Sequence, residues 1–75
     1  MSDADTITHL RVKVGATWLH AVAAGTEVEV RKRLEDADEV WKRPGVECCA
    51  SRPIDAWQGP FPKAGGIRQW AVEED

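Results

Sequence analysis

Four tryptophans in 75 residues, with one phenylalanine and no tyrosine, most constrain what this chain can fold into. A domain of this size buries only about 60% of the surface that its unfolded chain exposes, so its core depends on a few large side chains. Trp18, Trp41, Trp57 and Trp70 are spread along the whole sequence. We therefore expect remote parts of the chain to bring their indole rings into one cluster.

The length allows a single small domain, which we place at residues 6–72 between an N-terminal tail, residues 1–5, and an acidic tail, residues 73–75. Hydrophobic residues make up 43% of the chain and charged residues 31%, a globular balance that excludes a disordered segment. No apolar run approaches the roughly 20 residues of a membrane-spanning helix. The polar start and the lack of a spaced cysteine framework predict a cytoplasmic protein with reduced thiols.

Residues Thr6–Val14 alternate between polar and apolar, which predicts a strand with one buried face. Gly15-Ala16 then fits a two-residue hairpin loop that begins with glycine, because glycine adopts positive φ without a steric cost. A returning strand follows. The resulting register pairs Val12 with Leu19, Leu10 with Ala21, and Lys13 with Trp18, the last as a cation near an indole ring.

Residues 26–43 admit two interpretations. Thr26 to Leu34 alternates again and predicts a third strand, which we prefer because two β-branched residues near its start are poor helix formers. The alternative is a helix, because Thr26 and Glu29 match a capping box. In a helix, one face would carry the apolar residues Val30, Leu34, Ala37 and Trp41. Val28 would point away from this face.

The remaining chain predicts one short helix near residues 36–43 with Asp36 as its cap, ended by Pro44-Gly45. A buried strand is expected at Val46–Ala50, a long connection at Ser51–Gly66, and a closing strand at Ile67–Val72. The predicted fold is mainly β: a small twisted sheet or SH3-like half-barrel of about five strands. The SH3-like comparison concerns size and strand count only, and it implies no function.

The sequence gives little support for catalysis. Cysteines, histidines and carboxylates are present, but no nucleophile elbow, zinc-protease motif or phosphate-binding loop occurs. A domain this small also has little room for a pocket that excludes water. We therefore predict that the protein is not an enzyme and uses no cofactor.

A zinc site built from Cys48, Cys49, His9 and His20 is the sharpest chemical hypothesis, since two thiolates and two imidazoles complete a tetrahedral shell. Adjacent cysteines seldom chelate one ion together, because their side chains diverge. We favour the alternative that one cysteine faces the core and the other a polar surface, with no bound metal. His9 and His20 are expected on the outer face of the first hairpin.

Nucleic-acid binding is the alternative function, through a small β-barrel with a basic strand and a stacking tryptophan. Its candidate residues are Arg31, Lys32, Arg33, Lys13 and Trp18. The formal net charge of -3 opposes it, because acidic neighbours surround the basic run and weaken the field that a phosphate backbone would meet.

The preferred function is protein binding or a structural accessory role, as an assembly component or a modulator of a host protein. The candidate contact residues lie in one proline-rich loop: Trp57, Pro60, Phe61 and Pro62. The alternative is that Trp57 and Phe61 form a lid over the sheet. Small size and a composition typical of GC-rich genomes suggest a bacteriophage or mobile-element origin, which places the protein in a host cytoplasm or a virion. A homo-oligomer is expected, because association would bury the sheet edges.

Overall fold

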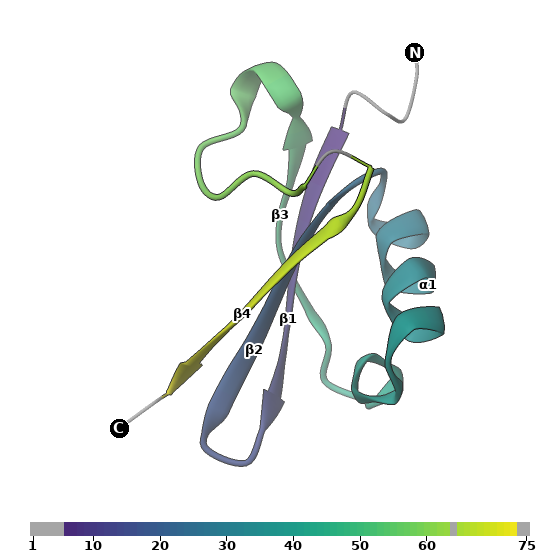
Figure 1. Ribbon diagram of the computed structural model, residues 1–75, viewed down its shortest axis with the longest axis vertical. Helices are drawn as coiled ribbons and strands as arrows, with labels where there is room; N and C mark the ends of the chain where they lie inside the picture. The colour runs from purple at the N-terminus through teal and green to yellow at the C-terminus, as the bar shows by residue number, and fades with distance from the viewer. Residues whose placement is uncertain (1–5, 64, 74–75) are drawn as a thin grey trace.

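The chain forms one antiparallel sheet of four strands with a helix on one face, in the computed structural model shown in Figure 1. The structure describes residues 6–63 and 65–73, so the predicted tail at residues 1–5 and the last two residues lie outside it. The elements are β1 (Thr6–Val14), β2 (Thr17–Ala24), α1 (Glu27–Ala37), η2 (Glu39–Lys42), β3 (Glu47–Pro53), η3 (Ile54–Ala56) and β4 (Ile67–Glu73). Glu73, assigned to a tail from the sequence, ends β4.

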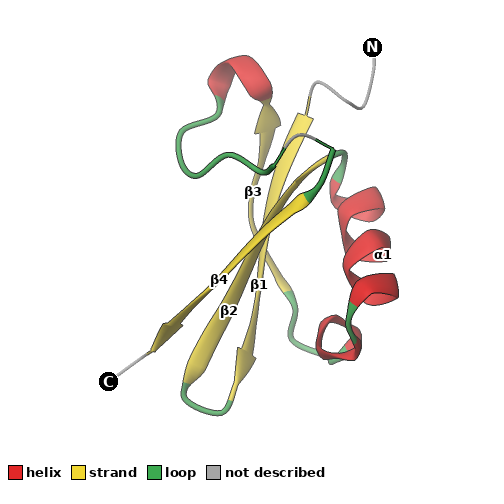
Figure 2. Ribbon diagram, in the orientation of Figure 1, coloured by secondary structure: helices red, strands yellow, loops and turns green. Residues whose placement is uncertain are grey.

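The strands lie in the order β3-β1-β2-β4, and Figure 2 shows α1 on one side of this sheet. The connection from β3 to β4 lies on the other side. The expected mainly β architecture is confirmed, but with four strands in an open sheet instead of about five, and the SH3-like half-barrel is not confirmed. Within residues 6–63 and 65–73, no helix has the length and apolar character needed to cross a membrane.

The predicted first hairpin is confirmed in both its turn and its register. β1 and β2 pair Val12 with Leu19, Leu10 with Ala21, and Lys13 with Trp18. Gly15 has a φ of 64°, and no described residue other than glycine has a positive φ. A positive φ at the first loop position alone is the geometry that requires glycine there, so this residue fixes the register of the hairpin formed by β1 and β2.

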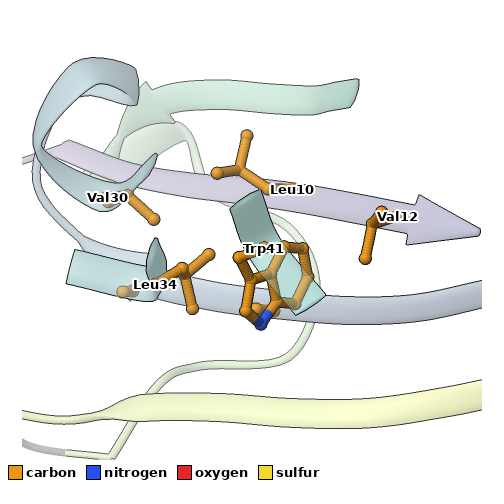
Figure 3. Packing of buried hydrophobic residues seen from close by; sticks show 7 residues of the cluster. Leu10, Val12, Val30, Leu34 and Trp41 are labelled. Carbon is orange, nitrogen blue, oxygen red and sulfur yellow. The ribbon is translucent and has the colours of Figure 1, made fainter. Parts of the chain in front are cut away.

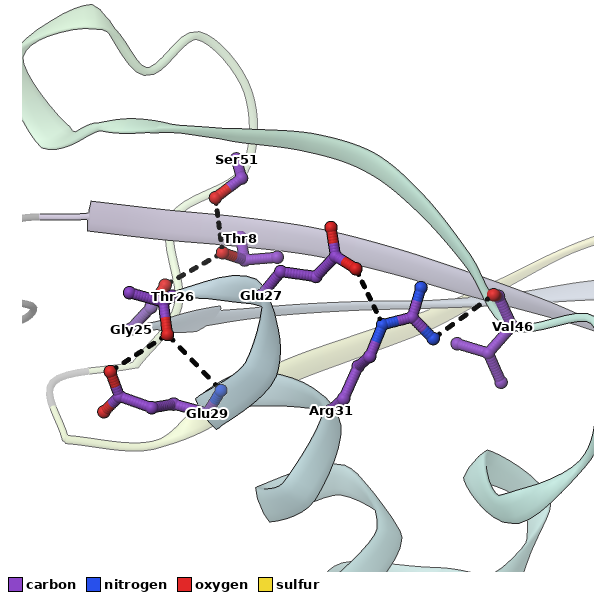
Figure 4. Close-up of polar contacts among 8 residues, drawn as sticks. All are labelled: Thr8, Gly25, Thr26, Glu27, Glu29, Arg31, Val46 and Ser51. Carbon is purple, nitrogen blue, oxygen red and sulfur yellow. Dashed lines mark hydrogen bonds and ion pairs between the residues drawn. The ribbon is translucent and has the colours of Figure 1, made fainter.

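The preferred strand at Thr26 to Leu34 is wrong: this segment begins α1, as the alternative interpretation stated. The hydroxyl of Thr26 accepts a hydrogen bond from the backbone N–H of Glu29 at 3.4 Å (Figure 4). β2 already lies between β1 and β4, so no edge of β2 is left for another strand. Val28, the residue that counted against a helix, is 77% exposed. Its outward position therefore destabilises α1 only through the slightly lower helix propensity of a β-branched residue.

The short helix expected near residues 36–43 is divided between two elements. α1 continues through Asp36, and the cap of the next turn is Asp38, whose carboxylate accepts a hydrogen bond from the N–H of Val40 at 3.0 Å. The 3-10 turn η2 follows and places Trp41 in the core. Pro44 and Gly45 then turn the chain into β3, which starts at Glu47 and is a half-exposed edge strand rather than a buried one.

The inner core lies between α1 and the sheet (Figure 3). It contains Leu10, Val12, Ala21, Ala23, Val30, Leu34 and Trp41. The expectation that the tryptophans share one cluster is wrong, because Trp57 packs with Ile7 and Val22 in a second cluster, and Trp70 packs against that one. Strand alternation explains the division: neighbouring residues of β1 point to opposite faces, and both faces carry apolar side chains.

Polar contacts join α1 to the strands behind it (Figure 4). Thr8 is fully buried, and its hydroxyl donates to the carbonyl of Gly25 at 2.8 Å and lies 3.0 Å from the hydroxyl of Ser51. Arg31 pairs with Glu27 one turn earlier at 3.0 Å and donates to the carbonyl of Val46 at 3.3 Å. These bonds hold the helix start and β3 against β1, which positions the opposite face of the sheet.

Candidate functional site

The face of the sheet opposite α1, here called the outer face, carries most of the candidate functional residues. Strand alternation places His9, Arg11 and Lys13 of β1 on it, beside Trp18 and His20 of β2. The β3–β4 connection covers the end of this face near Ile7, where Trp57 is only 8% exposed. The rest of the outer face has no covering layer among the described residues.

Two histidines and two tryptophans meet at the centre of the outer face. His9 Nε2 lies 2.9 Å from His20 Nδ1, a hydrogen-bond distance across β1 and β2. The ring of His20 is stacked on Trp70 with centroids 5.2 Å apart, and the Trp57 ring meets His9 edge-on at 6.5 Å. His9 therefore lies between two indole rings, and His20 lies between Trp70 and His9, on the outer face where both histidines were expected.

The neutral form of both histidines is favoured. Burial lowers the pKa of His9, with smaller effects from the nearby His20 and the Arg11 guanidinium. Burial also lowers the pKa of His20, again assisted by Arg11. Because only one of the two facing nitrogens has to donate, two neutral rings satisfy the short hydrogen bond between them.

The adjacent cysteines face opposite sides of the sheet. Cys48 packs against the inner core, where burial and a hydrogen bond with Glu27 raise its pKa. The pairing of β1 with β3 slips by one residue after His9, so Cys49 is the extra residue of a β-bulge. The Cys49 side chain consequently lies on the outer face, near both histidines. This is the division between core and polar surface that the sequence favoured.

Trp18 lies further along the outer face beneath two cations. The Lys13 ammonium is 5.7 Å from the indole centroid, which confirms the predicted pair, but the Arg11 guanidinium is nearer at 4.2 Å. Arg11 also forms an ion pair with Glu47 of β3 at 2.8 Å. The stacking surface of Trp18 is thus in contact with side chains of the protein itself.

The residues proposed for nucleic-acid binding do not form one surface. Arg31, Lys32 and Arg33 lie on α1, not on a strand, whereas Lys13 and Trp18 belong to the outer face behind the sheet. Arg33 donates to the carbonyl of Ala24 at 2.9 Å, and Arg31 is bound to Glu27. The sheet separates the two basic groups, and two of the three helical cations already have protein partners.

The proline-rich connection combines a buried ring with an exposed ring. Trp57 is buried, and its indole N–H donates to the carbonyl of Pro60 at 2.9 Å, which folds the loop over its own tryptophan. Phe61 is 56% exposed, Pro60 is exposed and Pro62 is half-buried. Trp57 therefore has the lid role, while Phe61 remains available for contact with another molecule.

One edge of the sheet also presents a candidate contact that the sequence analysis did not identify. β4 pairs continuously with β2 from Ile67 to Glu73, and no described strand lies on its outer edge. Val72 is 46% exposed on this strand. The signal was present in the sequence, because Ile67 to Glu73 contains no proline and has charged residues only near its ends.

The hairpin register could also have revealed the histidine pair. His9 lies opposite Val22 and His20 lies opposite Arg11, so the two histidines are diagonal neighbours on one face. The described residues enclose no detected cavity beside them. Comparison of the chain with protein-family models, curated proteins and solved structures gave no match.

Proposed function

We propose that this protein is a non-enzymatic structural or accessory protein that acts by protein contact, and that it self-associates through the outer edge of β4. The observation that carries the proposal is this edge, seven residues long, with no bulge in its pairing to β2 and no proline. An edge strand of this kind offers a row of backbone N–H and C=O groups to another strand.

The other edge of the sheet is protected, which favours β4 as the contact. β3 contains the bulge at Cys49 and ends at Pro53, and both features interrupt a regular ladder on that side. Its exposed charges include Glu47 and Arg52. Natural sheets use bulges, prolines and charges in this way to prevent edge-to-edge pairing, so the contrast between the two edges is informative.

A second copy of the chain fits the charges of β4. Arg68 lies near the start of the strand and Glu73 at its end, while the residues between them are uncharged. In an antiparallel pair related by a twofold axis, the Arg68 end of one strand lies beside the Glu73 end of its partner. Arg68 and Glu73 point to opposite faces of β4 and do not pair directly, but in this arrangement no two like charges are opposed, and the sheet becomes continuous across two protomers.

Sedimentation equilibrium of the full chain tests this proposal. Val72→Lys places a charge on the edge and is expected to raise the dimer dissociation constant at least about tenfold, equivalent to about 1.4 kcal/mol. Val28→Lys makes the same change at a valine that is 77% exposed on α1, and it is expected to leave association unchanged. A wild-type chain that stays monomeric at high concentration would contradict the proposal, as would equal effects of the two substitutions.

Phe61 supplies a second apolar contact in the proposal, because it is exposed in the connection that leads to β4. Phe61→Ala is expected to weaken self-association with an unchanged circular dichroism spectrum. Trp57→Ala is expected to lower stability, since Trp57 is buried with Ile7 and Val22. Pro60 and Pro62 act indirectly by restricting the loop, so the measured contact energy is expected to come from Phe61.

A further inference from the structure

Three side chains from three strands bring metal-binding atoms together on the outer face. One ligand atom each from His9, His20 and Cys49 lies within 4.8 Å of the other two. β1 and β2 supply the histidines as diagonal neighbours, and the bulge in β3 turns Cys49 toward them. The three ligands come from β1, β2 and β3, and none comes from β4, whose free edge lies on the far side of β2 from β3.

The spacing of these atoms is close to that of a tetrahedral metal shell. Bond lengths of about 2.0–2.1 Å to nitrogen and 2.3 Å to sulfur place two nitrogens and one sulfur about 3.3–3.6 Å apart around zinc. The two imidazole nitrogens are now 2.9 Å apart and share a hydrogen bond. Turning the two rings until both nitrogens face a common centre, a few tenths of an ångström further apart, and moving the sulfur by at most about 1.3 Å would form the shell without a change in backbone register.

The surroundings hold the ligands in place and leave an approach open. Trp70 stacks on His20, with centroids 5.2 Å apart, and lies 5.3 Å from the ring of His9, so both rings have restricted orientations. Such support of the ligands raises metal affinity, because less side-chain order is lost on binding. Cys49 is exposed, which gives an ion access from solvent. Cys48 belongs to the opposite face and does not take part.

We infer that His9, His20 and Cys49 form a binding site for a zinc-type divalent transition-metal ion, with a fourth position open to water. Imidazole and thiolate ligands select such ions over magnesium or calcium, which prefer oxygen. On binding, the Cys49 thiol releases its proton to solvent and the sulfur bonds to the metal, while the histidines bind through neutral nitrogens. The set differs from the four-residue zinc hypothesis of the sequence, which included both cysteines.

Cobalt(II) titration of the reduced, metal-free full chain tests the site. We expect a near-ultraviolet thiolate-to-cobalt charge-transfer band and visible bands typical of tetrahedral coordination, both complete at one equivalent. Zinc(II) is expected to abolish them by displacing the cobalt. A chain that gives no thiolate-to-cobalt band under these conditions would overturn the inference.

The two cysteines provide a matched pair of variants. Cys49→Ser is expected to remove the band and to weaken zinc binding at least about tenfold, whereas Cys48→Ser is expected to retain both. Far-ultraviolet circular dichroism shows whether each variant is folded, and His20→Gln replaces Cys49→Ser if that variant is not. Loss of the band in Cys48→Ser, or its retention in folded Cys49→Ser or His20→Gln, would show that other residues bind the metal.

Discussion

Trp41 fills the space between α1 and the sheet, yet its buried indole N–H has no hydrogen-bond acceptor among the described residues. An unsatisfied buried donor costs about 1–3 kcal/mol. The ring must therefore contribute more through apolar burial than its polar group costs. A chain of this length has a total stability of only about 4–11 kcal/mol, so this residue controls a large share of it.

Trp41→Ala is expected to lower the free energy of unfolding by about 3–5 kcal/mol, measured by urea denaturation. Trp41→Phe is expected to cost clearly less, because it retains much of the apolar surface and removes the unsatisfied N–H. Trp18→Ala, on the partly exposed outer face, serves as the comparison and is expected to cost less than Trp41→Ala. Equal losses for Trp41→Phe and Trp41→Ala would mean that the N–H has an acceptor.

The helix α1 depends at its start on one side chain. The hydroxyl of Thr26 accepts from the N–H of Glu29 and donates to the carboxylate of Glu29 at 3.0 Å. Thr26→Ala is expected to lower the free energy of unfolding by about 0.5–2 kcal/mol, whereas Thr26→Ser retains the hydroxyl and is expected to cost much less. Chemical denaturation compares the two variants. A serine variant as unstable as the alanine variant would show that the cap contributes nothing.

This helix also shows where sequence patterns are ambiguous. Alternating valines and a helical stripe are both present between Thr26 and Trp41, and local preference alone favoured the strand. The choice is made by tertiary structure, because β4 occupies the edge of β2 that a third consecutive strand would need. The first hairpin was predictable in every pair because its turn depends on Gly15 alone.

Across the whole molecule, the basic side chains considered for nucleic-acid binding are divided between the helix α1 and the outer face of the sheet. The basic residues of α1 and those near Trp18 lie on opposite sides of the sheet, and the formal net charge is -3. We expect the protein to pass through a heparin column at low salt without retention. Retention that falls steeply with salt would contradict this expectation. In that case Arg31→Ala and Lys13→Ala would identify which layer binds the polyanion.

The candidate sites were predictable only where they depend on local pairing. The outer-face position of His9 and His20 follows from the hairpin. The approach of Cys49 depends instead on a bulge in the pairing of β1 with β3, whose partner residues are at least 36 positions apart in the sequence, the separation of Arg11 and Glu47. No periodicity marks such a bulge in advance. The burial of Trp57 beside an exposed Phe61 likewise depends on how a long connection returns to the sheet.

The bulge at Cys49 behaves as a one-residue insertion in an otherwise regular ladder. His9 pairs with Ala50 and Leu10 with Cys48, so the partners on either side would be consecutive if Cys49 were deleted. Insertion or deletion of one codon can therefore add or remove the Cys49 thiol, while all four strands keep their neighbours in the sheet. A chain of this architecture can acquire a new chemical group without redesigning its scaffold.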